Sequence, residues 1–186
     1  MKPTSETRLT GSEPVQAGIT LTAAIVSAGN VDTPYHRLGH GRPVVVLGLW
    51  SDLDPRAIPT DLLTLGTRCR IVVPDLERVV ATASPVGPVK ASFGGWLCGF
   101  LDGLGLASAT MIASWVLEEQ LLHDLGDLSG RIDRIVIVGG AVSRPRITPP
   151  TATAPVLIWR AGSRPSWDDV GRFLAAQEPS IGAPGR

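Results

Sequence analysis

Ser114 has the sequence setting in which a serine can act as a nucleophile. The apolar run Met111 to Ala113 is typical of a buried strand, and a segment of helical character follows the serine directly. A serine at such a turn can present its hydroxyl beside helix N-terminal amides, as in a nucleophile elbow. The elbow favours small residues two positions before and after the serine, where Ile112 and Val116 stand. An ordinary helix N-cap is therefore the alternative role of Ser114.

Carboxylates are the next candidates for proton transfer. Asp52 and Asp54 follow Trp50 in a predicted loop, and Asp75 ends the apolar run Ile71 to Val73. A carboxylate near a bound ligand can accept a proton, so Asp52 and Asp75 are candidate catalytic residues. Capping of a turn or helix is the alternative role of each.

The three histidines do not complete a catalytic triad with Ser114. His36 and His40 precede the first central strand, so we expect both at the amino-terminal end of the sheet. His123 lies about two helical turns beyond Ser114. No histidine follows the last predicted strand, where the order serine, acid, histidine requires one. The sequence therefore predicts that the triad is incomplete.

The residues that end the predicted strands indicate a pocket for an apolar molecule. In open α/β sheets the ligand lies beyond the carboxyl ends of the strands. These positions are mostly apolar and aromatic, which suits an apolar small molecule. We predict ligand contacts from Leu49, Trp50, Trp115, Trp159 and Arg160. An ion pair with a neighbouring acid is the alternative role of Arg160.

The sequence offers little support for a metal ion or a nucleotide. Two cysteines and three histidines show no spacing typical of metal ligands. The segment Gly39-His40-Gly41 precedes a strand, whereas a dinucleotide fingerprint must follow one. We therefore predict no metal and no cofactor.

Short apolar runs alternate with segments of helical period along the chain. Runs rich in valine and isoleucine predict strands that are covered on both faces; they are Ile19 to Val26, Val44 to Leu49, Ile71 to Val73, Ala109 to Ala113, Ile135 to Val138 and Val156 to Trp159. The predicted helices are Thr60 to Leu65, Phe93 to Leu104, Trp115 to Leu125 and a segment that starts at Ser166. This alternation predicts an α/β fold, with a mostly parallel sheet and helices on both faces.

Composition restricts the class of protein. The chain has 186 residues, of which 44% are hydrophobic, so most of it is expected to fold as one domain. Lys+Arg and Asp+Glu are equal at 17 each, which argues against a nucleic acid or a membrane surface as a partner. The two cysteines, Cys69 and Cys98, and the lack of an apolar leader or membrane span predict a cytoplasmic protein.

Both ends of the chain are polar and lack periodicity. We predict a flexible arm over residues 1–16, an ordered domain over residues 17–177 and a flexible tail over residues 178–186.

Six segments together resemble the α/β-hydrolase superfamily in order and spacing. Val31 to Leu49 is similar to the family's second and third strands, and Ile71 to Leu76 to its fourth strand. Trp96 to Leu106 is similar to the helix before the nucleophile strand, and Ala109 to Val116 to that strand with its elbow. Arg131 to Gly140 and Thr153 to Gly162 are similar to the sixth and seventh strands. The resemblance implies the α/β-hydrolase fold.

The catalytic positions depart from the family pattern. Gly48-Leu49 stands where the family has the His-Gly of its oxyanion loop, and only Ser114 matches the G-x-S-x-G elbow. The family's acid, eighth strand and histidine have no counterpart, and the cap is reduced to the link from Ser143 to Thr153. The fold therefore carries over, but hydrolysis does not.

The leading hypothesis is a truncated α/β-hydrolase-like protein that binds an apolar small molecule and promotes a non-hydrolytic step, such as a cyclisation, isomerisation or elimination. One alternative is an esterase or thioesterase that depends on Ser114. Another is a non-catalytic partner of a second protein. Because the run Val156 to Trp159 is expected at the sheet edge, we also predict a homodimer through this strand.

Overall fold

A computed structural model describes most of the chain. The described residues are 13–16, 19–28, 31–49, 60–77, 93–124, 126, 128, 130–139, 157–160 and 166–175. Two predicted site residues, Trp50 and Asp52, lie outside them, as does the predicted remnant of a cap at residues 143–153.

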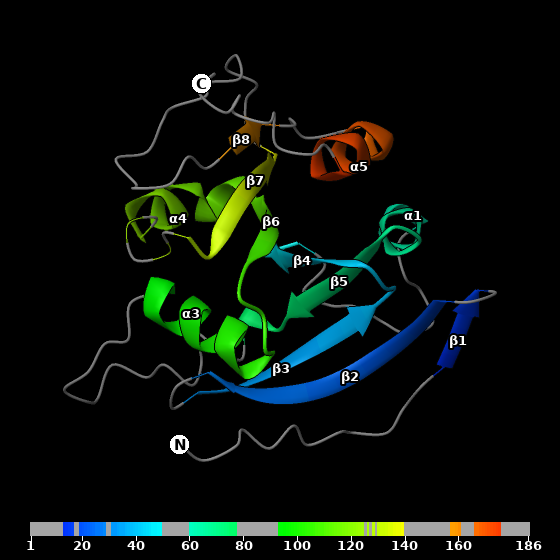
Figure 1. The fold of residues 1–186 in the computed structure, drawn as a ribbon, viewed down its shortest axis with the longest axis horizontal. Helices are drawn as coiled ribbons and strands as arrows, with labels where there is room; N and C mark the ends of the chain where they lie inside the picture. Colours follow the sequence, from blue (N-terminus) through cyan, green and yellow to red (C-terminus); the bar gives the residue numbers. More distant parts are fainter. Residues whose placement is uncertain are drawn as a thin grey trace, which may run out of the picture.

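One sheet of eight strands forms the centre of the molecule (Figure 1). The spatial order of its strands is β1 (Glu13–Gln16), β2 (Ile19–Ala28), β3 (Val31–Leu38), β5 (Cys69–Pro74), β4 (Arg42–Leu47), β6 (Ala109–Ser114), β7 (Ile132–Val138) and β8 (Leu157–Arg160). The five strands from β5 to β8 are parallel, and the pairs β1 with β2, β2 with β3 and β3 with β5 are antiparallel. The predicted mostly parallel sheet is confirmed.

Successive residues of the central strands alternate between two apolar cores. Val45 and Leu47 of β4 join the core under α3 (Phe93–Gly103) and α4 (Glu118–Asp124). Val44 and Val46 join the core under α1 (Thr60–Gly66) and α5 (Trp167–Ala175). This period-2 alternation, with both faces apolar, is what a sheet covered on both sides requires. We call the two faces the α3 face and the α1 face.

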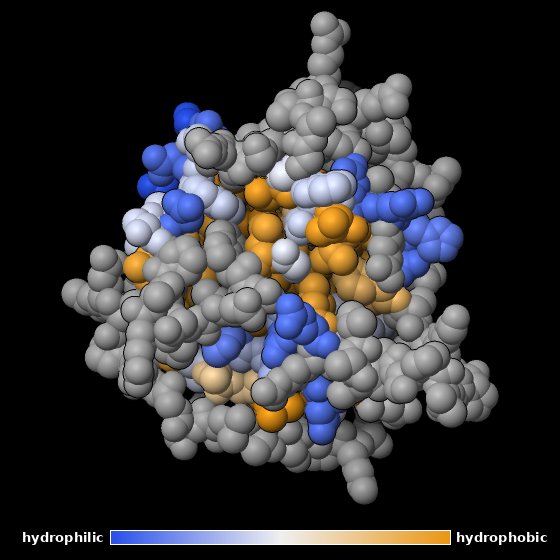
Figure 2. Space-filling model, turned by 180° about the vertical axis from the view of Figure 1, so that it is seen from behind, coloured by the Kyte–Doolittle hydropathy of each residue, from blue (hydrophilic) through white to orange (hydrophobic). Residues whose placement is uncertain are grey.

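The predicted helices are confirmed, with small changes at their ends. Trp96, Leu97, Phe100 and Leu101 bury one stripe of α3, as the spacing of apolar residues predicts. The helical segment after Ser114 begins with a short 3₁₀ turn, η1 (Trp115–Leu117), before α4. Seen from behind, apolar side chains lie at the centre of the molecule's face and hydrophilic ones lie around them (Figure 2).

Two strands lie where the apolar runs alone did not predict them. Residues 13–16, which we assigned to the flexible arm, form β1 and pair with β2. The strand β3, with the sequence VDTPYHRL, is interrupted by polar residues and Pro34, and only the family resemblance indicated it. Its antiparallel pairing explains the mixed composition, because it lies outside the buried parallel strands.

The strand β8 is the last strand of the sheet within the described part of the chain. This agrees with the predicted edge position of the run Val156 to Trp159. None of the helices among the described residues combines the length and the apolar composition that a membrane crossing needs.

Candidate functional site

The candidate site lies where β4 and β6 end side by side. The two strands are parallel neighbours, and Leu47 pairs with Ala113 in their register. The chain leaves β4 towards α1 on one face of the sheet and leaves β6 towards α4 on the other face. Such a divergence is the topological switch point at which open α/β sheets bind their ligands.

Two glycines bring the strand ends close to the segment after Ser114. Gly48 has a φ of +66°, and a Cβ added to it would lie 3.3 Å from the Cβ of Ser114 and 2.9 Å from Cδ1 of Leu117. Gly139, at the end of β7, has a φ of +99°, and an added Cβ would lie 2.4 Å from Cδ1 of Trp115. Only glycine fits these two close approaches without strain. We call the group formed by Gly48, Leu49, Ser114, Trp115, Leu117 and Gly139 the carboxyl-edge shelf.

The backbone of Ser114 is not that of a strained nucleophile elbow. Its φ of −64° and ψ of 143° are those of ordinary extended chain. The side chain of Ser114 also makes no cap hydrogen bond to η1, although the residue stands at the N-cap position. The alternative role of Ser114 as an N-cap is therefore met in position but not by a side-chain hydrogen bond.

Exposed apolar side chains stand directly beside Ser114. Trp115 and Val116 have exposed fractions of 54% and 65%, and they are the large apolar residues most exposed among the described part of the chain. Leu49 and Leu117 are half-buried and pack against the two cores. Exposing an indole and a valine to water is unfavourable, so an apolar contact at this surface would be stabilising.

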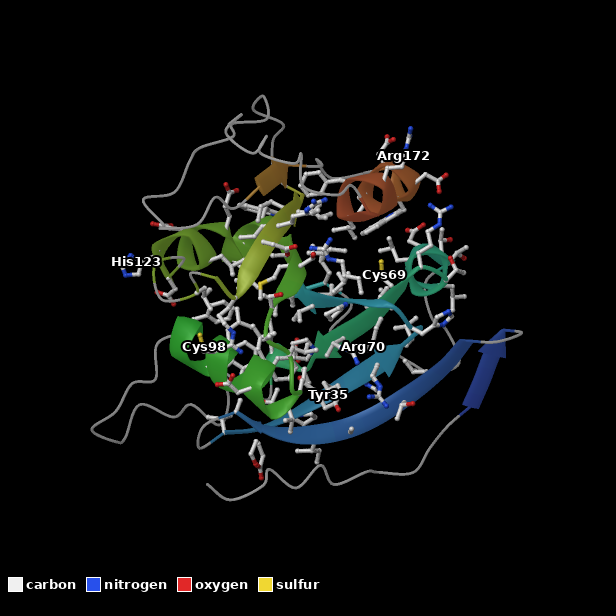
Figure 3. All side chains as sticks on the ribbon, viewed as in Figure 1. Tyr35, Cys69, Arg70, Cys98, His123 and Arg172 are labelled. Carbon is white, nitrogen blue, oxygen red and sulfur yellow. The ribbon has the colours of Figure 1, made fainter. Side chains whose placement is uncertain are left out.

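None of the three histidines is placed to act as a base for Ser114. His40 follows β3 near the amino-terminal end of β5, as predicted, and His123 is exposed near the end of α4, away from β6 (Figure 3). The prediction for His36 is wrong: β3 runs antiparallel, and His36 pairs with Val73 close to the carboxyl end of β5. It is still three strands from β6, or about 14 Å at the usual strand spacing. A base for a nucleophilic serine must lie within hydrogen-bond reach.

Asp75 lies at the same edge of the sheet as Ser114, but two strands away. Its backbone N–H donates to the carbonyl oxygen of Pro34 over 2.9 Å. Two strand spacings, about 10 Å, separate its position from that of Ser114, with β4 between them. Its carboxylate is close enough to His36 to raise the pKa of that imidazole, although burial has the larger effect and the pKa is lowered overall.

For the two remaining predicted contact residues, Trp159 and Arg160, the structure gives the backbone position. Trp159 and Arg160 are the last residues of β8, and Arg160 pairs with Ile137 of β7. The structure thus groups Leu49, Ser114 and Trp115, and it adds Leu117, which is not among the predicted site residues. Leu117 had no signal beyond its position three residues after the serine.

The described residues contain no group of three or more histidine, cysteine, aspartate or glutamate side chains that could hold a metal ion. What the shelf offers is the exposed apolar surface of Trp115 and Val116 beside Ser114, which is itself 7% exposed. Such a surface can bind an apolar molecule and place one polar group against it.

Comparison with known proteins gives structural matches alone. No protein-family model and no curated protein matches the sequence. A candidate hydrolase from Bacillus subtilis superposes with a TM-score of 0.50 at 16% identity, over 65% of this chain and 44% of the other. This likeness concerns the fold only.

Two further matches have lower TM-scores. A mutant of the meta-cleavage product hydrolase from Pseudomonas fluorescens IP01 gives 0.46 at 20% identity, over 66% of this chain and 48% of the other. Naproxen esterase from Bacillus subtilis gives a TM-score of 0.47 at 15% identity, over 65% of this chain and 44% of the other. The matched part of this chain therefore spans less than half the length of each of these three proteins.

Proposed function

The chain has the α/β-hydrolase fold, and on that premise we propose that its carboxyl-edge shelf binds an apolar small molecule without the help of a Ser-acid-His triad. The observation that carries the proposal is the ordinary extended backbone of Ser114 beside the exposed indole of Trp115. An elbow nucleophile needs a strained turn and a base within reach, and the positions of the three histidines argue against both a direct base and a relay.

Any reaction at the shelf is proposed to be a non-hydrolytic step, such as a cyclisation, an isomerisation or an elimination. Such steps need a surface that fixes the shape of the substrate, excludes water and supplies one or two polar groups. The hydroxyl of Ser114 is the polar group within the shelf, and the carboxylate of Asp75 lies at the same edge of the sheet.

Fluorescence titration with N-phenyl-1-naphthylamine, a neutral apolar fluorophore, tests the binding proposal. We expect saturable binding to the full chain and binding at least tenfold weaker in Trp115→Ala, because the exposed indole provides much of the contact area. Trp159→Ala is expected to weaken binding as well, since β8 ends at the same edge.

The control variant is Leu104→Ala, which shortens a half-buried apolar side chain at the C-terminal end of α3. Its affinity for the fluorophore should equal that of the unmodified chain. Equal affinities of the unmodified chain and of Trp115→Ala would contradict the assignment of the shelf.

The second candidate function is an esterase or thioesterase that uses Ser114 as a nucleophile. The position of Ser114 at the end of β6, at the switch point of the sheet, favours it. A fluorophosphonate probe followed by intact-mass measurement separates the two functions. The binding proposal predicts no adduct on Ser114, whereas one adduct per chain that disappears in Ser114→Ala would establish the esterase.

We also propose a cytoplasmic protein that forms a homodimer through β8. Cys69 and Cys98 are not joined in a disulfide, which suits a reducing compartment. An edge strand presents unpaired backbone groups that a second copy can pair with. Light scattering at micromolar concentration should give twice the mass of the chain, and a monomeric mass would exclude the dimer.

A further inference from the structure

Two arginines lie side by side on the α3 face, near the amino-terminal ends of the parallel strands. Arg37 of β3 pairs with Val72 of β5, and Arg70 is two residues before Val72. Residues that pair directly, and residues two apart on one strand, share a face of the sheet. Arg37 and Arg70 are therefore diagonal neighbours on one face, about 7 Å apart at the base of their side chains.

Both side chains are half-buried. Within the described part of the chain, no hydrogen bond or ion pair joins either guanidinium to another group, and the Nε of Arg70 is buried without a partner. Three other arginines do have carboxylate partners: Arg42 with Asp133, Arg131 with Asp102, and Arg172 with Asp169. A buried N–H without an acceptor and two adjacent like charges are both unfavourable.

The strands on either side of the pair place small side chains beside the two arginines. Thr22 of β2 pairs with Arg37 and Pro43 of β4 pairs with Arg70, so a hydroxyl and a short ring border the two arginines. The contact of α3 with β2 lies further along, where Gly103 packs against Val26 and the carbonyl of Ser27. Figure 3 shows Arg70 between β5 and β3, to the side of α3.

We propose that Arg37 and Arg70 form a binding site for a phosphate group, separate from the carboxyl-edge shelf. A guanidinium presents several N–H donors in a plane that matches the oxygens of a phosphate. A phosphate carries about 1.5 to 2 negative charges at neutral pH, which balances two arginines better than a carboxylate does. It would also give the buried Nε of Arg70 the acceptor that it lacks.

Isothermal titration calorimetry of the full chain with inorganic phosphate, at constant ionic strength, tests the site. We expect one saturable site per chain, and at least tenfold weaker binding in Arg37→Gln and in Arg70→Gln. Arg68→Gln is the matched control, because Arg68 is exposed in the turn before β5 and its loss changes the net charge equally. Its affinity should equal that of the unmodified chain.

Two outcomes would overturn the proposal: no saturable heat with the unmodified chain, or equal affinities in Arg70→Gln and Arg68→Gln. Titration with glycerol 3-phosphate distinguishes the source of the phosphate group. Tighter binding than inorganic phosphate identifies a phosphate ester as the ligand, and weaker binding identifies free phosphate.

The unfolding temperature of Arg70→Gln separates a binding role of Arg70 from a purely structural role. A structural role predicts that the substitution lowers this temperature. Without phosphate, Arg70→Gln should unfold at the same temperature as the unmodified chain or higher, because an unpartnered buried N–H is removed. At the same phosphate concentration, the unmodified chain should gain more stability than Arg70→Gln does. A lower unfolding temperature of Arg70→Gln in the absence of phosphate would contradict the proposal.

Discussion

Asp124 joins two helices of the α3 face through a single buried carboxylate. The side chain is 8% exposed at the end of α4, and its Oδ2 accepts a hydrogen bond of 2.7 Å from the backbone N–H of Gly94 in the first turn of α3. The close approach requires glycine, since a Cβ on Gly94 would lie 2.9 Å from the Cβ of Asp124. A carboxylate at this position satisfies a free helix amide and complements the helix dipole.

We predict that Asp124→Ala lowers the free energy of unfolding by about 0.5 to 2 kcal/mol, the range for loss of a helix cap. Asp124→Asn keeps an acceptor oxygen and should lose less. Urea unfolding of the three proteins measures the difference. Equal stabilities of the unmodified chain and Asp124→Ala would show that the hydrogen bond does not hold α3.

His36 makes stability depend on pH in a defined direction. Burial lowers the pKa of its imidazole, and the charge of Asp75 offsets only part of this effect. The folded state therefore favours the neutral imidazole. The resulting stability is present above the unfolded pKa of about 6.5 and is lost as the pH falls towards the lower folded pKa.

We expect His36→Gln to lose less stability on acidification than the unmodified chain does. Urea unfolding at about pH 8 and about pH 5 gives the two differences to compare. Equal losses in both proteins would mean that another group causes the acid sensitivity.

At the scale of elements, α5 is held against the sheet by apolar contacts and by one buried arginine. Val170 and Leu174 are 0% and 1% exposed in the core of the α1 face. Arg134 of β7 is 2% exposed and donates from one Nη to the carbonyl oxygen of Phe173, in the last turn of α5. Its guanidinium also lies 5.8 Å from the centre of the Phe173 ring. A cation at the C-terminal end of a helix interacts favourably with the helix dipole.

We predict that Arg134→Met loosens α5 and lowers the free energy of unfolding by about 1.5 to 3 kcal/mol, as expected for a hydrogen bond from a charged donor. Hydrogen exchange should become faster in the amides of α5 before it does in those of β6. Arg134→Lys keeps the charge and should show a smaller effect. Unchanged exchange in α5 of the methionine variant would exclude this role.

The sequence predicted best the elements whose buried faces meet only apolar surroundings. The strands β4, β6 and β7 are apolar on both faces because helices cover both, and the stripe of α3 follows one core. The strand β3 was visible only through the family resemblance, because its polar residues and Pro34 belong to an antiparallel strand. The predicted position of His36 was at the wrong end of the sheet, because sequence order alone does not tell whether a strand is parallel or antiparallel to its neighbour.

The candidate site was predictable to a similar extent. Leu49, Ser114 and Trp115 come together because parallel strands end at one edge of the sheet. The missing cap bond of Ser114 and the approach of Gly139 to Trp115 depend on tertiary packing, which no local pattern encodes.

For the whole molecule, one sheet carries two surfaces of different chemistry at its two ends. The carboxyl-edge shelf is apolar, whereas the amino-terminal end of the α3 face carries Arg37 and Arg70. Because the two proposed sites share no residue, phosphate should leave the affinity for N-phenyl-1-naphthylamine unchanged. Competition between the two in a fluorescence titration would mean that they bind to one site.

A crystal structure of the full chain soaked with N-phenyl-1-naphthylamine would locate the bound fluorophore. We expect it to lie against the indole of Trp115, with its rings over Ser114, Leu49 and Leu117. Electron density for the fluorophore at any other place, with the carboxyl-edge shelf filled by solvent, would contradict this expectation.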